Sequence, residues 1–175
     1  GGPGPARCLQ TTSRYGGDLL VPRSQATPSD VARHYDRLGT FYRKLWGEHL
    51  HHGVWNDPSD RSSVGMATRR LLELTVAPLG IQPGTRLIDI GCGYGADAHW
   101  IAERLGAEVT GLTLSPHQVE VASHRRSSAK DRVRICLGDW LDNNQPAHSF
   151  HAAIAIESLS HMQDKPAFFR QLARV

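Results

Sequence analysis

The sequence has few cysteines and no long apolar run, and each shortage excludes a class of protein. The cysteines are three in number and form no close C-x-x-C pair, so neither a disulfide framework nor a zinc site is predicted. No apolar stretch approaches the ~20 residues that span a bilayer, and the first residues lack the apolar segment of a secretory signal. We therefore expect reduced thiols, no membrane span and a cytoplasmic location.

A strong excess of one charge is also missing. The 175 residues carry 20 Lys and Arg against 17 Asp and Glu, a net charge of +3. The basic side chains are scattered, and the densest group, residues 124–126, falls on a predicted helix, where we expect a solvated face. We predict no nucleic-acid partner. The length, with 39% hydrophobic and 21% charged residues, is typical of one globular domain.

The two ends of the chain differ from its middle. Residues 1–28 are rich in Gly, Pro, Ser and Thr and contain LVPRS, which is similar to a protease-site linker. We expect a disordered leader or a vector-derived remnant there. At the other end, Asp164 is the expected cap of a predicted helix. The sequence stops at residue 175, before any signal that would end this helix. We expect the domain to be truncated after its fourth strand, which would leave residues 151–156 as an apolar edge with poor solubility, open to a homodimer contact.

Helical and strand patterns alternate between these ends. Helical spacing predicts helices over residues 29–45, 62–79, 96–105 and 115–127, and short apolar runs predict strands over 86–90, 108–112, 133–137 and 151–156. Such alternation is typical of a parallel sheet with right-handed crossovers. The fold class predicted is α/β, a Rossmann-like, doubly wound, mainly parallel sheet. Residues 81–175 would form its binding core and residues 29–80 an N-terminal helical cover.

A glycine-rich loop follows the first predicted strand. It reads DIGCGYG from Asp89 to Gly95, at the place where an α/β sheet leaves backbone N–H groups and a helix start free for a ligand. The dinucleotide fingerprint needs G-x-G-x-x-G, whereas this loop reads G-x-G-x-G. Asp89 would repel a pyrophosphate and attract an ammonium group. The loop therefore favours a ligand with a positive end.

This loop resembles the first motif of the class I S-adenosylmethionine-dependent methyltransferases. Three further segments, VTGLTLS (109–115), GDW (138–140) and IESLSHM (156–162), are similar to the branch that methylates sterols, tocopherols and cyclopropane lipids, as is WGEHLHHG (46–53). The resemblance covers residues 29–175. It implies S-adenosylmethionine as cofactor and methyl transfer to a small, partly lipophilic molecule through a C, O or N acceptor.

The resemblance also implies a set of cofactor-binding residues. Glycines let the backbone approach the methionine part, Asp89 holds its amino group, and a threonine, a leucine and a glutamine replace the usual acidic ribose ligand. An aspartate accepts from the adenine amine, a tryptophan stacks on the ring, and a tyrosine reaches over the cofactor. The set is Tyr35, Asp89, Gly91, Gly93, Gly95, Thr113, Leu114, Gln118, Asp139 and Trp140. The alternatives are structural: a tight glycine turn, a helix-capping Asp89, a plain helix start at residues 113–118, a core tryptophan and a helix-packing tyrosine.

Catalysis asks for little beyond alignment, because the sulfonium is already an excellent leaving group. A base is needed only for some acceptors. His161, just past the fourth predicted strand, suits proton removal, with Glu157 as its partner or as a stabiliser of positive charge. A hydrogen-bonded structural histidine is the alternative for His161.

Residues 48–52 read EHLHH, and imidazole and carboxylate groups suit divalent ions. Their spacing does not place three ligands on one helix face, and Trp46 and Trp55 nearby favour a lid over an apolar substrate pocket. No metal is predicted. Two other functions stay open: a cofactor-binding protein of this fold without catalysis, and a nucleotide-binding oxidoreductase, which the glycine spacing disfavours.

Overall fold

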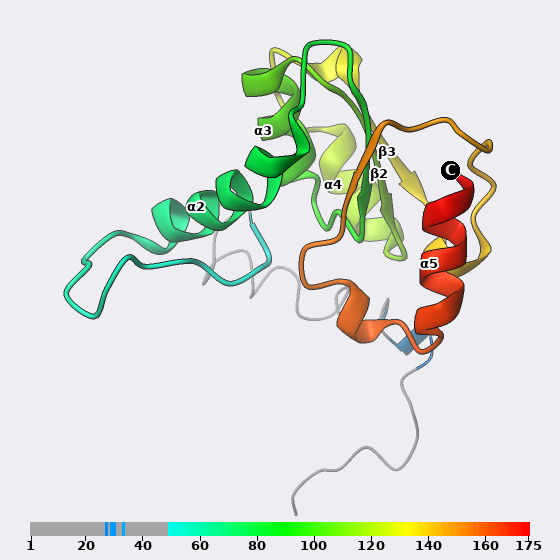
Figure 1. Ribbon diagram of the computed structural model, residues 1–175, viewed down its shortest axis with the longest axis horizontal. Helices are drawn as coiled ribbons and strands as arrows, with labels where there is room; N and C mark the ends of the chain where they lie inside the picture. Colours follow the sequence, from blue (N-terminus) through cyan, green and yellow to red (C-terminus); the bar gives the residue numbers. More distant parts are fainter. Residues whose placement is uncertain (1–26, 28, 31–32, 34–48) are drawn as a thin grey trace, which may run out of the picture.

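The structure is a computed structural model that describes residues 27, 29–30, 33 and 49–175 (Figure 1). The predicted leader, most of the helix predicted over 29–45 and Tyr35 therefore lie outside the described residues. The elements in chain order are α2 (Val64–Val76), η1 (Ala77–Leu79), β1 (Arg86–Ile90), α3 (Ala96–Leu105), β2 (Glu108–Thr113), α4 (Pro116–Ser123), η2 (Lys130–Arg132), β3 (Val133–Leu137), η3 (Trp140–Asp142), β4 (Ala152–Ile154), η4 (Leu159–His161) and α5 (Lys165–Arg174).

The four strands form one parallel sheet in the order β3-β2-β1-β4. Leu87 of β1 pairs with Val109 of β2 on one side and with Ala152 of β4 on the other. The first strand thus lies inside the sheet. The next two strands, β2 and β3, are added on one side of β1, and β4 is added on its other side. In open α/β sheets ligands bind at such a reversal, outside the carboxyl ends of the strands. The α/β, parallel fold class predicted from the sequence is confirmed.

Two apolar cores cover the two faces of the sheet. Helices α2 and α3 pack on one face, where Leu72, Leu87 and Ile101 are buried in a single cluster, and α5 packs on the other, where Ile88 and Phe168 are buried. Figure 1 shows α2 and α3 on one side of the strands and the red helix α5 on the other. Successive residues of β1 point to opposite faces, so a strand buried on both faces reads as a continuous apolar run.

Local signals set several element boundaries where the sequence predicts them. The bounds of β1, α3 and β3 are those predicted. The Ser115 side chain accepts a hydrogen bond from the Gln118 backbone N and so caps α4, and Asp164 caps α5 in the same way through Ala167. Capping oxygens satisfy backbone N–H groups that the first helical turn leaves unpaired.

Three elements, predicted over residues 62–79, 115–127 and 151–156, are shorter in the structure than predicted, and β2 runs one residue further, to Thr113. Helix α2 gives way to a 3-10 turn at residue 77 because Pro78 cannot donate the next helical hydrogen bond. Helix α4 ends at Ser123, where His124 donates its backbone N–H to Val121, so Arg125 and Arg126 lie beyond the helix predicted to carry them. Strand β4 covers only residues 152–154 of the predicted 151–156.

None of the described helices is long and apolar enough to cross a membrane.

Close packing of β2 against β3 and against the loop after β1 leaves no room for a side chain at Gly111. A Cβ there would lie 2.7 Å from both Cys92 Sγ and Ile135 Cδ1. We expect Gly111→Ala to lower the free energy of unfolding by about 1–3 kcal/mol, because a buried methyl group would force its neighbours apart. The matched control is Gly65→Ala in α2, where a Cβ would meet nothing within 4 Å and alanine favours the helix by up to ~1 kcal/mol. Urea unfolding measures both, and equal stability of the two variants would contradict this packing.

Candidate functional site

A cavity of about 570 Å³ lies at the carboxyl ends of all four strands. Each strand contributes to its wall: Gly91 and Gly93 follow β1, Thr113 ends β2, Asp139 follows β3 and Glu157 follows β4. The volume falls within the range of ordinary small-molecule sites. The sheet topology, rather than any single loop, therefore gathers the site.

The glycines after β1 adopt left-handed backbone conformations, with φ of +79° at Gly91, +55° at Gly93 and +72° at Gly95. A Cβ on Gly91 would lie 2.3 Å from the Cβ of Ser158, so the loop passes directly against the chain that follows β4. Gly91 and Gly93 line the cavity. Gly95 is absent from its wall and instead forms the N-cap of α3 against Ile135, which supports the structural alternative there.

The carboxylate of Asp89 is the most unusual group in the cavity wall. The residue is 3% exposed, and its Oδ2 has no hydrogen-bond partner among the described residues. Burial and the nearby charge of Asp97 raise its pKa well above the usual value, against the opposing effect of His51. A buried carboxylate oxygen without a donor is costly. An ammonium group arriving in the cavity would satisfy it, so the site fits the positive end of the predicted cofactor.

Asp89 does not cap a helix, since the N-cap of α3 is Gly95. The capping alternative for Asp89 is therefore wrong.

The residues predicted to hold the ribose lie together at the end of β2. Thr113 Oγ1 donates to Gln118 Oε1 at 2.5 Å and accepts from the Ser115 backbone N at 3.2 Å. Thr113, Leu114 and Gln118 all line the cavity. Because the Gln118 oxygen is engaged, its amide nitrogen is the end that can donate to a ligand. The contacts support the plain helix-start alternative as well, and the ribose role stays a prediction.

Trp140 borders the cavity from within the apolar core beneath α5. It is 2% exposed, its Nε1 donates to the Phe168 carbonyl at 3.3 Å, and its ring lies 5.8 Å from the Phe168 ring. These contacts fit the core-aromatic alternative, and stacking on adenine stays a prediction. Asp139 also lines the cavity and accepts from the Leu141 backbone N at 2.9 Å.

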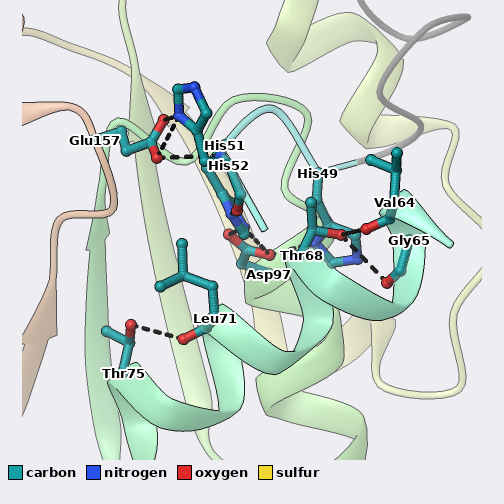
Figure 2. A network of polar contacts seen from close by, with 10 residues as sticks. All are labelled: His49, His51, His52, Val64, Gly65, Thr68, Leu71, Thr75, Asp97 and Glu157. Atoms are coloured by element: carbon teal, nitrogen blue, oxygen red, sulfur yellow. Dashed lines mark hydrogen bonds and ion pairs between the residues drawn. The ribbon is translucent and has the colours of Figure 1, made fainter. Parts of the chain in front are cut away.

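A histidine-rich segment, residues 49–52, also lines the cavity. His49 Nδ1 lies 2.5 Å from Asp97 Oδ1, and His51 Nε2 lies 3.2 Å from Asp97 Oδ2 (Figure 2). Asp97 stands in the first turn of α3 and is nearly buried. Sequence reasoning missed Asp97, although an acidic residue in the first turn after a glycine loop is a recognisable signal.

The same three side chains form a group that could hold a divalent ion, since their ligand atoms lie within 4.8 Å of one another. The separation of His49 and Asp97 is that of a hydrogen bond, however, whereas two ligands on one tetrahedral ion with bonds of about 2 Å lie roughly 3.3 Å apart. We interpret the group as a pair of histidine–carboxylate contacts that fasten residues 49–52 to α3.

Both ring nitrogens of His51 face hydrogen-bond acceptors. Nδ1 lies 2.8 Å from the His52 carbonyl and Nε2 faces the Asp97 carboxylate, so the contacts favour the doubly protonated ring. Burial works to lower the pKa of His51, but the hydrogen bond and charge of Asp97 outweigh it and raise that pKa. Burial likewise works to raise the pKa of Asp97, while hydrogen bonds with His49 and His51 lower it to about 2.

Glu157 directs its carboxylate at His52. It accepts hydrogen bonds from the His52 backbone N at 3.1 Å and lies 2.8 Å and 2.9 Å from His52 Nδ1. Its backbone is left-handed, with φ of +58°. His161, at the end of η4, lines the cavity and is exposed. The sequence predicted Glu157 as the partner of His161, whereas the contacts described here pair it with His52, which sequence reasoning placed only in a lid.

The chain matches the protein family described as mycolic acid cyclopropane synthetase over residues 23–175. Among curated relatives, 27-O-demethylrifamycin SV methyltransferase of Amycolatopsis mediterranei (strain S699) is 38% identical over 154 residues, which cover 87% of this chain and 56% of that protein. A probable chloroplastic tocopherol O-methyltransferase of Oryza sativa subsp. japonica is 32% identical, over 83% of this chain and 42% of that protein. The chain thus spans about half the length of the curated relatives it matches.

Solved structures agree on the fold. A crystal structure described as the [4+2]-cyclase SpnF superimposes with a TM-score of 0.80 at 30% identity, covering 86% of this chain and 56% of the other. Geranyl diphosphate C-methyltransferase from Streptomyces coelicolor A3(2), solved with Mg²⁺, geranyl diphosphate and S-adenosyl-L-homocysteine, gives a TM-score of 0.69 at 26% identity, over 86% and 62% of the two chains.

The histidine–carboxylate contacts predict how stability depends on pH. The raised pKa of His51 gives stability that is complete below its unfolded pKa of ~6.5 and is lost as pH rises through the folded value. The lowered pKa of Asp97 gives stability that is present above ~3.8 and is lost as pH falls toward 2. We expect Asp97→Asn to cost on the order of 2 kcal/mol, most clearly between about pH 4 and pH 6.5.

Thermal unfolding of the unchanged protein and of Asp97→Asn across this pH range measures the difference in their stability. Asp131→Asn serves as the control, because Asp131 is an exposed aspartate in η2, outside the cavity wall. A pH profile of Asp97→Asn parallel to that of the unchanged protein would show that these contacts contribute no net stability.

Proposed function

The chain belongs to the mycolic acid cyclopropane synthetase family of class I S-adenosylmethionine-dependent methyltransferases, and on this premise we propose that the protein transfers a methyl group from S-adenosylmethionine to a small, partly lipophilic molecule. The observation that carries the proposal is the buried carboxylate of Asp89 in a cavity lined by left-handed glycines. The cavity suits a compact ligand whose positive group binds Asp89 and whose atoms approach the backbone of Gly91 and Gly93. The methionine end of the cofactor has this chemistry.

The cofactor would lie along the carboxyl ends of the strands. Asp89 would accept from its ammonium group, and Gly91 and Gly93 would allow close approach of the chain. The ribose would meet Thr113, Leu114 and Gln118 at the end of β2, and the adenine would meet Asp139 and Trp140 after β3. When bound, S-adenosylmethionine supplies a sulfonium-activated methyl group. The protein's part is then to orient the acceptor and exclude water.

The acceptor we propose is a hydroxyl on a lipophilic natural product. Several of the similar proteins are named O-methyltransferases, and one is named for a rifamycin substrate. Polar groups that could position a hydroxyl, namely His52, Glu157, Ser160 and His161, line the cavity beside the apolar Leu141 and Met162. Glu157 and His161 are the residues that the sequence assigns to catalysis.

A second candidate function is a protein that keeps the cofactor cavity but performs other chemistry. The similarity to a structure described as a [4+2]-cyclase favours it, because the same fold there bears a name other than methyltransferase. The two candidates differ in one measurement. Mass spectrometry of a panel of lipophilic phenols and alcohols, incubated with protein and S-adenosylmethionine, detects a mass gain of one methylene group only if methyl transfer occurs.

Calorimetry tests the cofactor itself. We expect binding of S-adenosylmethionine and S-adenosylhomocysteine, and far weaker binding of nicotinamide cofactors. Gly93→Val should weaken binding by about 2 kcal/mol, roughly 30-fold, since Gly93 is left-handed and a side chain there would enter the cavity beside Leu50. Gly80→Val is the matched control, because Gly80 has a similar φ of +59° and lies outside the cavity wall. Undiminished affinity in Gly93→Val would overturn the placement of the cofactor.

The raised pKa of Asp89 predicts that binding depends on pH. An ammonium group needs the ionised carboxylate, and in the free protein the raised pKa keeps the protonated form present at higher pH than usual. Affinity for S-adenosylmethionine should therefore rise with pH above the range in which an ordinary carboxyl group titrates, by at most tenfold per unit, with release of a proton on binding. Asp89→Asn should bind more weakly and lose this slope. Calorimetry in buffers of different ionisation enthalpy counts the proton, and a slope that survives in Asp89→Asn would assign it to another group.

A further inference from the structure

We propose that His52, oriented by Glu157, is the general base that removes the proton from the acceptor hydroxyl. The inference rests on the proposed methyl transfer and adds to it a catalytic residue that the sequence did not predict. Its starting point is the group of contacts between the two residues, which lie 105 positions apart in the chain. Figure 2 shows the Glu157 carboxylate directed at the His52 ring.

Glu157 determines which ring nitrogen of His52 is basic. A carboxylate accepts hydrogen bonds and donates none, and both of its oxygens lie within 2.9 Å of His52 Nδ1. Nδ1 must therefore carry the hydrogen, so the lone pair of the neutral ring is on Nε2. The negative charge of Glu157 also stabilises the imidazolium that forms once Nε2 has taken a proton. A carboxylate serves a catalytic histidine in this way in the serine protease triad.

The position of Glu157 is strongly constrained. Its left-handed φ of +58° is uncommon for a glutamate, and such conformations persist only where the surroundings enforce them. Two contacts do so here: the next residue, Ser158, donates from Oγ to the Ile90 carbonyl at 2.5 Å, and Ser160 Oγ donates to the Glu157 carbonyl at 2.9 Å. The first contact ties the chain after β4 to the end of β1. Glu157 is thereby fixed relative to the glycine loop.

His52 is held from its other side by the segment that carries it. Its carbonyl accepts from the buried His51 ring, and its backbone N–H donates to Glu157. The main chain of His52 is thus held on two sides. His51 and Asp97 connect it to α3, and Glu157 connects it to the segment that follows β4. The ring itself is 77% exposed and lines the cavity, so a bulky acceptor can reach it. A fixed main chain with an accessible ring suits a base that must meet substrate and then release its proton to solvent.

The acceptor O–H bond breaks, and its proton passes to Nε2 of His52. The oxygen lone pair forms the new O–CH₃ bond, while the electron pair of the breaking methyl–sulfur bond goes to sulfur, so that the positive charge of the sulfonium disappears. Imidazolium is left on His52, paired with Glu157, and it loses its proton to water.

His161 is the competing base. It also lines the cavity, at the end of η4. The observation that favours His52 is the contact of both Glu157 carboxylate oxygens with its Nδ1. The third possibility is that the His52–Glu157 contact is purely structural: it holds residues 49–52 over the cofactor, and His52 transfers no proton. The experiments separate these three.

The first experiment needs no turnover. Two-bond ¹⁵N–¹H correlation spectra of the full chain with S-adenosylhomocysteine bound report the tautomer of each histidine. We expect the Nδ1–H form of His52 to dominate when the ring is neutral, and Glu157→Gln to abolish that preference. A dominant Nε2–H form in the unchanged protein would overturn the proposal, because Nε2 could not then accept a proton.

The second experiment measures turnover of phenolic acceptors from the screen. His52→Gln should lower kcat by ~10²–10⁴ with the Kd of S-adenosylhomocysteine unchanged within twofold, and Glu157→Gln should lower kcat by a smaller factor with that Kd also unchanged. The loss should shrink with 4-nitrophenol at alkaline pH, since that acceptor is already ionised. His124→Gln, an exposed histidine at the end of α4, is the control.

The other outcomes each contradict the proposal. A weakened Kd with kcat preserved at saturation would make the pair a fastening, and loss of activity in His161→Ala but not in His52→Gln would assign the base to His161. If the unchanged protein methylates none of the acceptors, the proposed function fails, and the tautomer measurement still decides whether His52 has the orientation of a base.

Discussion

The parallel pairing of β1 with strands on both of its sides is the constraint on which the site depends. It places the carboxyl ends of β2, β1 and β4 side by side, so that groups distant in sequence share one edge of the sheet. The loop after β1 then runs against the chain after β4 so closely that a Cβ on Gly91 would overlap Ser158. Left-handed glycine is what permits this approach, since any other residue would combine strain with a clash. The cavity wall and the position of Glu157 both follow from that contact.

At this edge of the sheet, carboxylates are paired with histidines. Three carboxylates, Asp89, Asp97 and Glu157, line one cavity, and such groups would repel one another if all were ionised without partners. Asp97 and Glu157 are matched by histidines of residues 49–52, which leaves Asp89 as the buried carboxylate with an unpartnered oxygen within the described chain. Asp89 is therefore the place in the cavity where a positive group would be stabilised most. A ligand that carries an ammonium group could bind there, beside the backbone of the glycine loop.

Local patterns in the sequence predicted the fold better than they predicted the site. The bounds of β1 and α3 follow from an apolar run, a glycine start and a glycine end, all of which act within a few residues. The contacts of Asp97 with His49 and His51, and that of Glu157 with His52, were missed because they span 46 to 105 positions, although the place of Asp97 in the first turn of α3 is itself a local signal. The helix predicted through Pro78 failed for the opposite reason, since amphipathic spacing was given more weight than a local rule that forbids the hydrogen bond.

The order of side chains in residues 49–52 explains how one short segment serves both ends of the cavity. His49 and His51 meet Asp97 beside the Asp89 carboxylate, while Leu50 lies next to the glycine loop and His52 meets Glu157. Under the proposed function, the residues that fasten the segment near the cofactor also fix the main chain of the base. Cofactor binding and acceptor orientation are then coupled through the main chain of one residue, because the His52 carbonyl is held by His51 and the His52 N–H by Glu157.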